Sequence, residues 1–327
     1  MPAPLYLQGV DVAAFGVPDA TPSQIQQASV QIDAFLQRRE GLIWVPDGNG
    51  NPCYMQGLTP KLSLTLNGSI TATPGYTNPM ANTGASLGAV QAGTITVNVA
   101  GPTGMLQVGD ALVIDAGTPT CEALVVMNVL GQQVTFLAAQ FNHAAGATLQ
   151  QGLLIAEQRT MPQDRPLTIL TRTPVAYVAS GVGRYGYMRR GSDTIGSIDV
   201  YNLLAVMSKF GGPPAWEWWN VQANSIDPST GQLWVPAGVL LAYYTEIRTH
   251  YVAGWQYSGL PSEIKQACAN IINNIAATQG LPASAQKFTA GGSSFQRFAT
   301  PPNRLNSLWI DDDTKALLAP YCARAYS

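Results

Sequence analysis

The stretch "HYVAGWQYSGLPSEIKQACANIINNI", residues 250–275, joins two kinds of periodicity and decides the expected fold. Its first residues end a run in which Tyr244, Glu246, Arg248 and His250 alternate onto one face, as in a β-strand. Pro261 then stands at the first position of a helix, where the missing N–H costs nothing. A strand, a hinge and an amphipathic helix are therefore expected in direct succession.

The helix after Pro261 has two unlike faces. The apolar stripe is expected to pack on the strand and a hairpin of the same chain: Ile264, Ala267, Cys268, Ile271, Ile272 and Ile275. The far face is polar yet nearly uncharged, and we expect it to meet the next subunit of an oligomer: Lys265, Gln266, Asn270, Asn273 and Asn274.

The low share of charged residues favours a protein whose surface is partly covered by partner proteins. Charged residues make up 11% of the 327 residues, against about 25% in an ordinary soluble domain. The net charge of -2 provides no broad positive field, which argues against tight, general binding to a phosphate backbone. The four cysteines are scattered and predict reduced thiols in a cytosol. No signal peptide or run of about 18 apolar residues is seen, so a soluble chain that does not enter a membrane is expected.

Residues 61–157 differ from their surroundings. They contain few charges, and four segments alternate apolar with small polar residues between glycine-rich turns: "GTITVNVAG", "ALVIDAG", "EALVVMNV" and "QQVTFLA". This pattern predicts an inserted small all-β domain, a barrel or a sandwich. Residues 1–60 and 158–280 are expected to form the core around it, and 281–327 an extended C-terminal arm with a short helix.

Further helices and a hairpin are expected in the flanking parts. Thr21 as N-cap and Pro22 at the first position predict a helix over "PSQIQQASVQIDAFLQ". A second helix is expected over 197–211, and three aspartates from Asp311 are expected to cap a short terminal one. "AWEWWNVQA" and "GQLWVPAG" flank a turn-rich segment and predict a hairpin.

The glycine pattern "GVGRYG", residues 181–186, is a poor nucleotide motif. A pyrophosphate site needs a helix to begin there, whereas further glycines follow at 191 and 196. A glycine-rich loop is expected instead. The adjoining basic residues Arg184, Arg189 and Arg190, with two tyrosines, predict a contact between subunits or with DNA in a channel.

No residue pattern predicts catalysis, a cofactor or a metal. The two histidines, His143 and His250, have no second ligand at metal-binding spacing, and a serine hydrolase signature is missing. The dense tryptophans Trp216, Trp218 and Trp219 favour a core or a subunit interface over a flat platform for sugars.

Several segments together resemble the head–tail connector (adaptor, or head-completion) proteins of tailed bacteriophages. They are "ASVQIDAFLQRR", "STGQLWVPAG", "EIRTHYVAGW" running straight into "LPSEIKQACANII", and "ALLAPYCARA". The resemblance covers roughly residues 5–60 and 160–327 and lies in the order of the elements. The inserted β domain is extra to the pattern, and its role stays open.

The resemblance implies an α+β fold with a mainly helical connector-type core and a β hairpin. It also implies a homo-oligomeric ring, usually of twelve copies, in the neck of a virion assembled in the bacterial cytoplasm. The ring would sit under the portal protein, extend the channel for double-stranded DNA without sequence specificity, and dock tail-completion (terminator) proteins. The arm would reach the portal with these residues: Trp309, Leu317, Leu318, Tyr321, Arg324 and Tyr326.

Two other functions remain open at this stage. A virion decoration or receptor-binding protein would use the β domain and the "WEWW" run to bind carbohydrate. An enzyme acting on polysaccharide would need paired carboxylates in a groove, but the acidic residues lie mostly in turns and helix caps.

Overall fold

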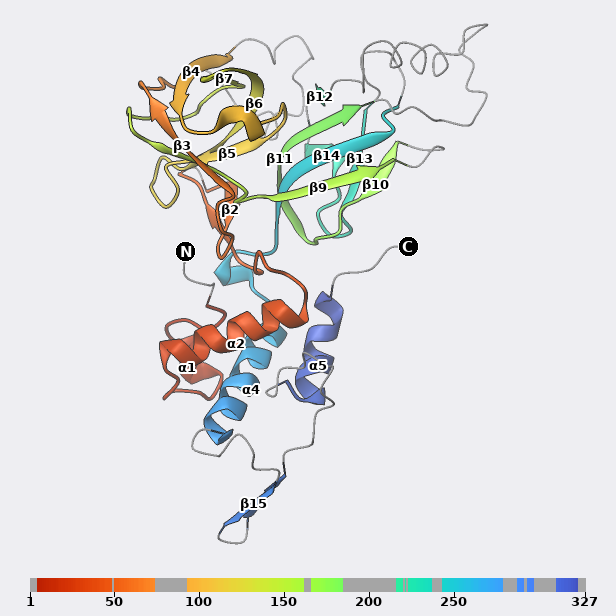
Figure 1. Cartoon of the computed structure of the whole chain (residues 1–327). Helices are drawn as coiled ribbons and strands as arrows, with labels where there is room; N and C mark the ends of the chain where they lie inside the picture. The colour runs from red at the N-terminus through yellow and green to blue at the C-terminus, as the bar shows by residue number, and fades with distance from the viewer. Residues whose placement is uncertain are drawn as a thin grey trace, which may run out of the picture. The chain divides into compact units, whose positions relative to one another are not determined.

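β-Strands make up most of the regular structure in the computed structural model (Figure 1). It describes residues 5–48, 50–73, 93–161, 166–184, 216–219, 221, 223–236, 243–278, 287–290, 293–296 and 310–322. Two compact units are present, which we call the β unit, Ile43–Gln256, and the helical unit, Pro2–Leu42 with Tyr257–Arg324.

The expectation of a mainly helical core is wrong. In the described residues the helices are confined to the helical unit: α1 (Asp11–Ala14), α2 (Pro22–Phe35), α4 (Ser262–Thr278) and α5 (Asp312–Leu318). In the part of the chain assigned to that core, β11 (Val175–Arg184) and β14 (Glu246–Ala253) are strands of a sheet, and the strand expected around residues 244–250 is among them. The helix expected over 197–211 lies outside the described residues.

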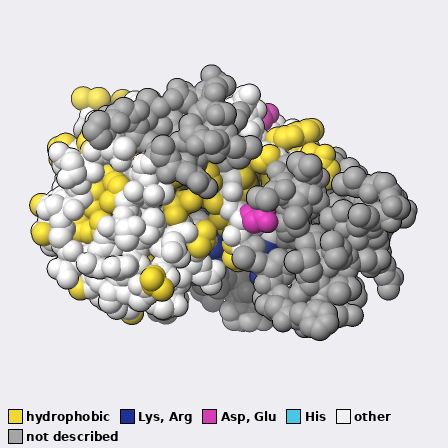
Figure 2. Space-filling model, turned by 90° about the horizontal axis from the view of Figure 1, so that it is seen from above, with side chains coloured by type: hydrophobic (Ala, Val, Ile, Leu, Met, Phe, Trp, Pro, Cys, Tyr) yellow, Lys and Arg dark blue, Asp and Glu magenta, His cyan; other side chains and the backbone are white. Residues whose placement is uncertain are grey.

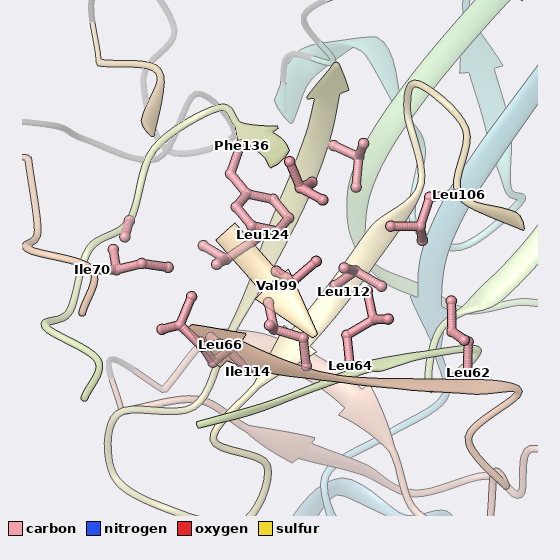
Figure 3. Close-up of a cluster of buried hydrophobic side chains, with 14 residues drawn as sticks. Leu62, Leu64, Leu66, Ile70, Val99, Leu106, Leu112, Ile114, Leu124 and Phe136 are labelled. Carbon is pink, nitrogen blue, oxygen red and sulfur yellow. The ribbon is translucent and has the colours of Figure 1, made fainter. Parts of the chain in front are cut away.

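The low-charge segment forms a closed barrel. Its six strands lie in the order β3-β4-β7-β6-β5-β8: β3 (Leu62–Asn67), β4 (Ile95–Ala100), β5 (Ala111–Ile114), β6 (Glu122–Leu130), β7 (Gln133–Phe136) and β8 (Thr148–Gln151). Leu64, Leu112 and Phe136 are among the side chains that fill the interior (Figure 3). Closure leaves the barrel without a free strand edge.

The remaining strands of the β unit form a four-stranded sheet and two small ones. The sheet has the order β12-β11-β14-β9, with β9 (Ile155–Thr160), β11 (Val175–Arg184), β12 (Glu217–Trp219) and β14 (Glu246–Ala253). The expected domain boundary at 157 falls inside β9. The small sheets pair β1 (Trp44–Pro46) with β2 (Pro52–Met55), and β10 (Leu167–Ile169) with β13 (Gln232–Trp234).

The hairpin expected between the "AWEWW" and "GQLWV" segments is largely wrong. β12 pairs with β11 and β13 pairs with β10, so the two strands belong to different sheets. Only the turn is local, with an isolated bridge between Ile226 and Leu233. The turn residues were correctly identified, because the Asp227 carboxylate accepts hydrogen bonds from the Ser229 N–H and from the Ser229 and Thr230 hydroxyls.

Two glycines of "GVGRYG" lie within strand β11 rather than in a loop. Antiparallel neighbours flank Gly181 and Gly183 on both sides. A Cβ on Gly181 would stand 2.5 Å from the Trp219 ring, and one on Gly183 would stand 2.3 Å from the Tyr244 ring. The glycines therefore make room for two stacked aromatic rings, whose centroids are 5.6 Å apart.

The helical unit is fixed by a cap and a buried polar network. Thr21 caps α2, as expected, in a reciprocal capping box with Gln24. At the start of the described chain the buried Tyr6 donates its hydroxyl to Asp33 and accepts a hydrogen bond of 2.9 Å from the Leu42 N–H. The segment before α2 and the segment after it are thereby tied to the helix.

Helix α4 begins after Pro261 as expected, and its six-residue apolar stripe is buried. Within the helical unit it packs on α2 and α5. The strand and the hairpin on which this stripe was expected to pack belong to the β unit.

The C-terminal segment contributes one helix and one pair of strands to the described chain. Asp311 caps α5 by accepting a hydrogen bond of 2.8 Å from the Thr314 N–H, as expected of the aspartate run. A short 3-10 turn at Ala319–Tyr321 follows. Strands β15 (Lys287–Ala290) and β16 (Ser293–Gln296) pair with each other, whereas the rest of the expected arm lies outside the described residues.

Replacing Gly183 by alanine tests this packing. The new Cβ would overlap the Tyr244 ring, and we expect the free energy of unfolding of the β unit to fall by about 1–3 kcal/mol. Urea unfolding followed by tryptophan fluorescence measures it. The matched control is Gly104→Ala, since a Cβ there meets nothing within 4 Å. Equal stability of the two variants would contradict the packing argument.

Candidate functional site

A polar seam lies where the four-stranded sheet meets the barrel within the β unit. We define the seam as Gln107, Gly109 and Asp110 of the barrel with Ser180, Arg248 and His250 of the sheet. Because Ser180 lies opposite His250, and Val182 opposite Arg248, these side chains share one face of the sheet. The prediction that Arg248 and His250 lie on the same face of a strand is thus confirmed.

Gly109 allows the close approach of the two layers. Its φ is +83°, and a Cβ there would stand 2.2 Å from a methyl group of Val182. The Ser180 hydroxyl donates a hydrogen bond of 2.5 Å to the Gly109 carbonyl. Arg248 adds a hydrogen bond of 2.8 Å to the Val108 carbonyl. Backbone groups of the barrel are therefore held directly by side chains of the sheet.

The seam contains the residue types of a serine hydrolase triad, but in the wrong arrangement. Ser180 Oγ is 3.1 Å from His250 Nδ1, and His250 Nε2 is 3.6 Å from Asp110 Oδ1. A nucleophilic serine must reach a substrate, whereas Ser180 is 2% exposed, His250 6% and Asp110 4%. The seam is suited to joining two layers and not to hydrolysis.

Burial controls the protonation of the seam. Loss of water around His250, reinforced by the positive charge of Arg248, lowers the pKa of this histidine to about 4. Burial also raises the pKa of Asp110, although a hydrogen bond from the Gln107 N–H and the charge of Arg248 oppose this. His250 is consequently neutral at neutral pH.

The basic residues proposed for a DNA channel are only partly described. Arg184 forms an ion pair of 2.5 Å with Glu246, and its guanidinium lies 4.6 Å from the Trp216 ring centroid. Arg248 lies 5.0 Å from the same ring. Arg189 and Arg190 lie outside the described residues.

The three tryptophans do not form a flat platform. Trp219 is 3% exposed and stacks on Tyr244 on one face of the sheet. Trp218 packs against Val125 and Leu137 of the barrel on the other face. Trp216 lies under the two arginines named above. The burial of Trp219 and the barrel contact of Trp218 fit the core interpretation better than a sugar platform does.

His143 is the centre of a second polar cluster, which the sequence did not reveal. Its Nδ1 is 2.7 Å from Asp115 and its Nε2 is 2.7 Å from Glu122. Glu122 also accepts hydrogen bonds from the N–H groups of Gln140 and Phe141. Both ring nitrogens are thus occupied by carboxylates. In the described residues, no group of three or more His, Cys, Asp and Glu side chains is arranged to hold a metal.

The carboxylates decide the charge of His143. Burial by itself lowers the pKa of His143, but the hydrogen bonds with Glu122 and Asp115 outweigh it and raise the pKa above its ordinary value. The cluster links the end of β5, the start of β6 and the loop after β7. It therefore braces one end of the barrel.

In the helical unit, four of the five residues expected at a subunit interface contact their own chain, and one of these contacts is the hydrogen bond of 3.0 Å that the Gln266 amide donates to Asn270. Lys265 Nζ lies 2.8 Å from Asp11. The side chains of Asn270 and Asn274 donate hydrogen bonds of 3.5 and 3.3 Å to Thr314 and Asp311, respectively. Gln266 and Asn273 are exposed. The polar face of α4 is thus partly used to hold α5.

Of the six residues expected to contact a portal protein, three lie in the described part of the chain. Leu318 is fully buried. Leu317 and Tyr321 are half-buried, and the Tyr321 hydroxyl is 3.3 Å from Glu263. Trp309, Arg324 and Tyr326 lie outside the described residues.

Replacing His143 by glutamine tests the brace. Because its folded pKa lies above the unfolded value of about 6.5, its stabilisation is fully present below that pH and is lost as pH rises through the folded pKa. We expect a loss on the order of 3 kcal/mol in acid that shrinks at alkaline pH. Urea unfolding across this range measures it, and a pH-independent loss would contradict the charged bridge.

His250 should show the opposite pH dependence. Its folded pKa of about 4 lies below the unfolded value of about 6.5, so the unfolded chain binds the extra proton between these values and wild-type stability falls as pH falls. The full effect is on the order of 3 kcal/mol. We expect His250→Gln to flatten this part of the stability curve, measured by the same unfolding series. An unchanged slope would argue against a neutral, buried His250.

Comparison of the chain with protein-family models, with curated proteins and with solved structures found no match in any of the three. Within the described residues, none of the helices is long and apolar enough to cross a membrane. The residues and their geometry are therefore the basis for a function.

Proposed function

We propose that this chain is a structural protein of a tailed-bacteriophage virion, an adaptor that assembles into a ring at the junction of head and tail. The ring would lie under the portal protein in the virion neck, continue the DNA channel and dock tail-completion proteins. Double-stranded DNA would pass without sequence-specific contact. The role needs no catalysis and no cofactor.

The main support for this proposal is which segments of the chain make up the helical unit. α2 comes from the start of the chain, and α4 and α5 come from its end, yet the three pack together. They contain three of the segments on which the resemblance to connector proteins rests. The other segments of the resemblance, "STGQLWVPAG" and "EIRTHYVAGW", lie in the β unit, which stands between α2 and α4 in the chain.

The surface agrees with a role in assembly. On the face shown in Figure 2, the described side chains are mostly hydrophobic or uncharged polar, with few acidic or basic groups. Exposed amides at Gln266 and Asn273 give α4 an uncharged outer edge. A ring buries two different faces of each subunit, so such an edge can be covered without removing charges from water.

The polar clusters of the β unit also support a structural role. Ser180 and His250 of the seam and His143 of the second cluster are buried, and their side chains bond to other side chains or to the backbone. Catalytic groups need access to a substrate. Both clusters instead connect elements of one unit.

Light scattering of the purified chain, alone and mixed with the portal protein of the same virus, tests the proposal. We expect a ring-sized species on the portal, and at high concentration for the chain alone. Mixing with the portal is essential because adaptor rings can require it. A chain that stays monomeric in both samples would overturn the proposal.

A double variant, Gln266→Lys with Asn273→Lys, tests the assembling face. Like charges on the edge of α4 should raise the concentration needed for assembly by about tenfold or more, equivalent to about 1.4 kcal/mol. The matched control is Gln133→Lys, the same change at an exposed position of the barrel. Circular dichroism of each variant checks the fold, and equal effects of both variants would show that another face assembles.

A further inference from the structure

Two of the four cysteines lie side by side in the β unit. Cys53 is in β2 and Cys121 directly precedes β6, and they are 68 residues apart in the chain. Their sulfur atoms are 3.6 Å apart. Cys53 is 2% exposed and Cys121 is 1% exposed, and both belong to a cluster with Met55, Val113 and Leu153.

The chain directly before Cys121 is exposed to solvent. An exposed turn, residues 117–119, lies just before it, and the Cys121 N–H closes this turn with a hydrogen bond of 3.1 Å to the Thr118 carbonyl. Turns with few buried contacts open locally at a lower free-energy cost than the core does. Opening of this turn would expose the Cys121 sulfur while the barrel stays folded.

The two thiols are chemically unequal. A hydrogen bond from Cys53, helped by the Gly117 N–H, holds the pKa of Cys121 below its ordinary value despite burial. The same contact and burial raise the pKa of Cys53 far above its ordinary value. Since the thiolate is the nucleophile in disulfide exchange, and the exposed turn 117–119 lies beside Cys121, we assign the first attack to Cys121 and the second to Cys53.

We propose that Cys53 and Cys121 form a redox-responsive pair that closes to an intramolecular disulfide on reaction with a low-molecular-weight disulfide such as oxidised glutathione. The Cys121 thiolate attacks one glutathione sulfur, which forms a mixed disulfide and releases the first glutathione thiolate. Cys53 then loses its proton to that thiolate and attacks the Cys121 sulfur. The second glutathione leaves as a thiolate, so two protein thiols are oxidised and one disulfide is reduced.

The geometry requires only a small movement. A disulfide bond needs the sulfurs at about 2.05 Å, and they already face each other at 3.6 Å. The bond would join β2 to the barrel and close a long loop in the unfolded chain, which raises resistance to unfolding. The proposal concerns these thiols alone and does not depend on the assembly role.

Mass spectrometry of the full chain tests the pair. The reduced protein is equilibrated with mixtures of reduced and oxidised glutathione, quenched in acid, denatured and labelled with a maleimide. We expect Cys53 and Cys121 to lose their label together, the peptides that contain them to appear cross-linked, and the urea midpoint of the β unit to rise. Cys268 and Cys322, both in the helical unit, are internal references in the same sample.

Two outcomes would overturn the proposal: retention of label at both positions when Cys322 is already modified, or separate glutathione adducts on Cys53 and Cys121. The variants Cys53→Ser and Cys121→Ser separate the roles. Cys53→Ser should trap the mixed disulfide on Cys121, whereas Cys121→Ser should leave Cys53 labelled. The wild-type experiment remains decisive if a variant fails to fold.

Discussion

Strand β14 has a hydrogen-bonded neighbour on each side, and this double pairing fixes where each residue of 246–253 must point. Arg248 and His250 face the barrel, while Ile247 and Tyr251 enter the core cluster on the other face. A slip of one residue would exchange the two sets. The positive charge of Arg248 would then enter an apolar core, so the register is strongly specified.

The few charges of the β unit act as internal fixing points. Burial alone would raise the pKa of Glu157, but hydrogen bonds from Thr171, Tyr251 and Arg159 hold the pKa below its ordinary value. The ionised carboxylate thereby ties the loop at Thr171 to β9 and β14. At the barrel end, the His143 ring is hydrogen-bonded to Glu122. At the seam, Asp110 accepts a hydrogen bond from Gln151. Low charge and internal use of charge together leave few charges on the exterior.

Local signals were predictable from the sequence, and long-range partners were not. The cap at Thr21, the start of α4 after Pro261 and the alternation of the barrel strands each depend on a few neighbouring residues. Pairing of β12 with β11, and of β13 with β10, joins segments far apart in the chain. The partners of His143 are 28 and 21 residues away. The mainly helical class was wrong because it was taken from the resemblance to connector proteins, whereas the four-stranded sheet depends on pairings between distant segments that the sequence does not show.

The barrel is inserted within the β unit, and the β unit is inserted between helices α2 and α4 of the chain. In each insertion, the first and last segments are paired with each other. In the barrel, the first strand β3 pairs with the last strand β8, so the chain enters and leaves at adjacent strands. In the β unit, Ile43 forms a parallel bridge with Trp255, and the Trp44 indole N–H donates to the Gly254 carbonyl at 3.1 Å. An insertion whose ends are held together adds little constraint to its host. The helical segments can therefore keep their own packing although a large β unit is inserted between them in the chain.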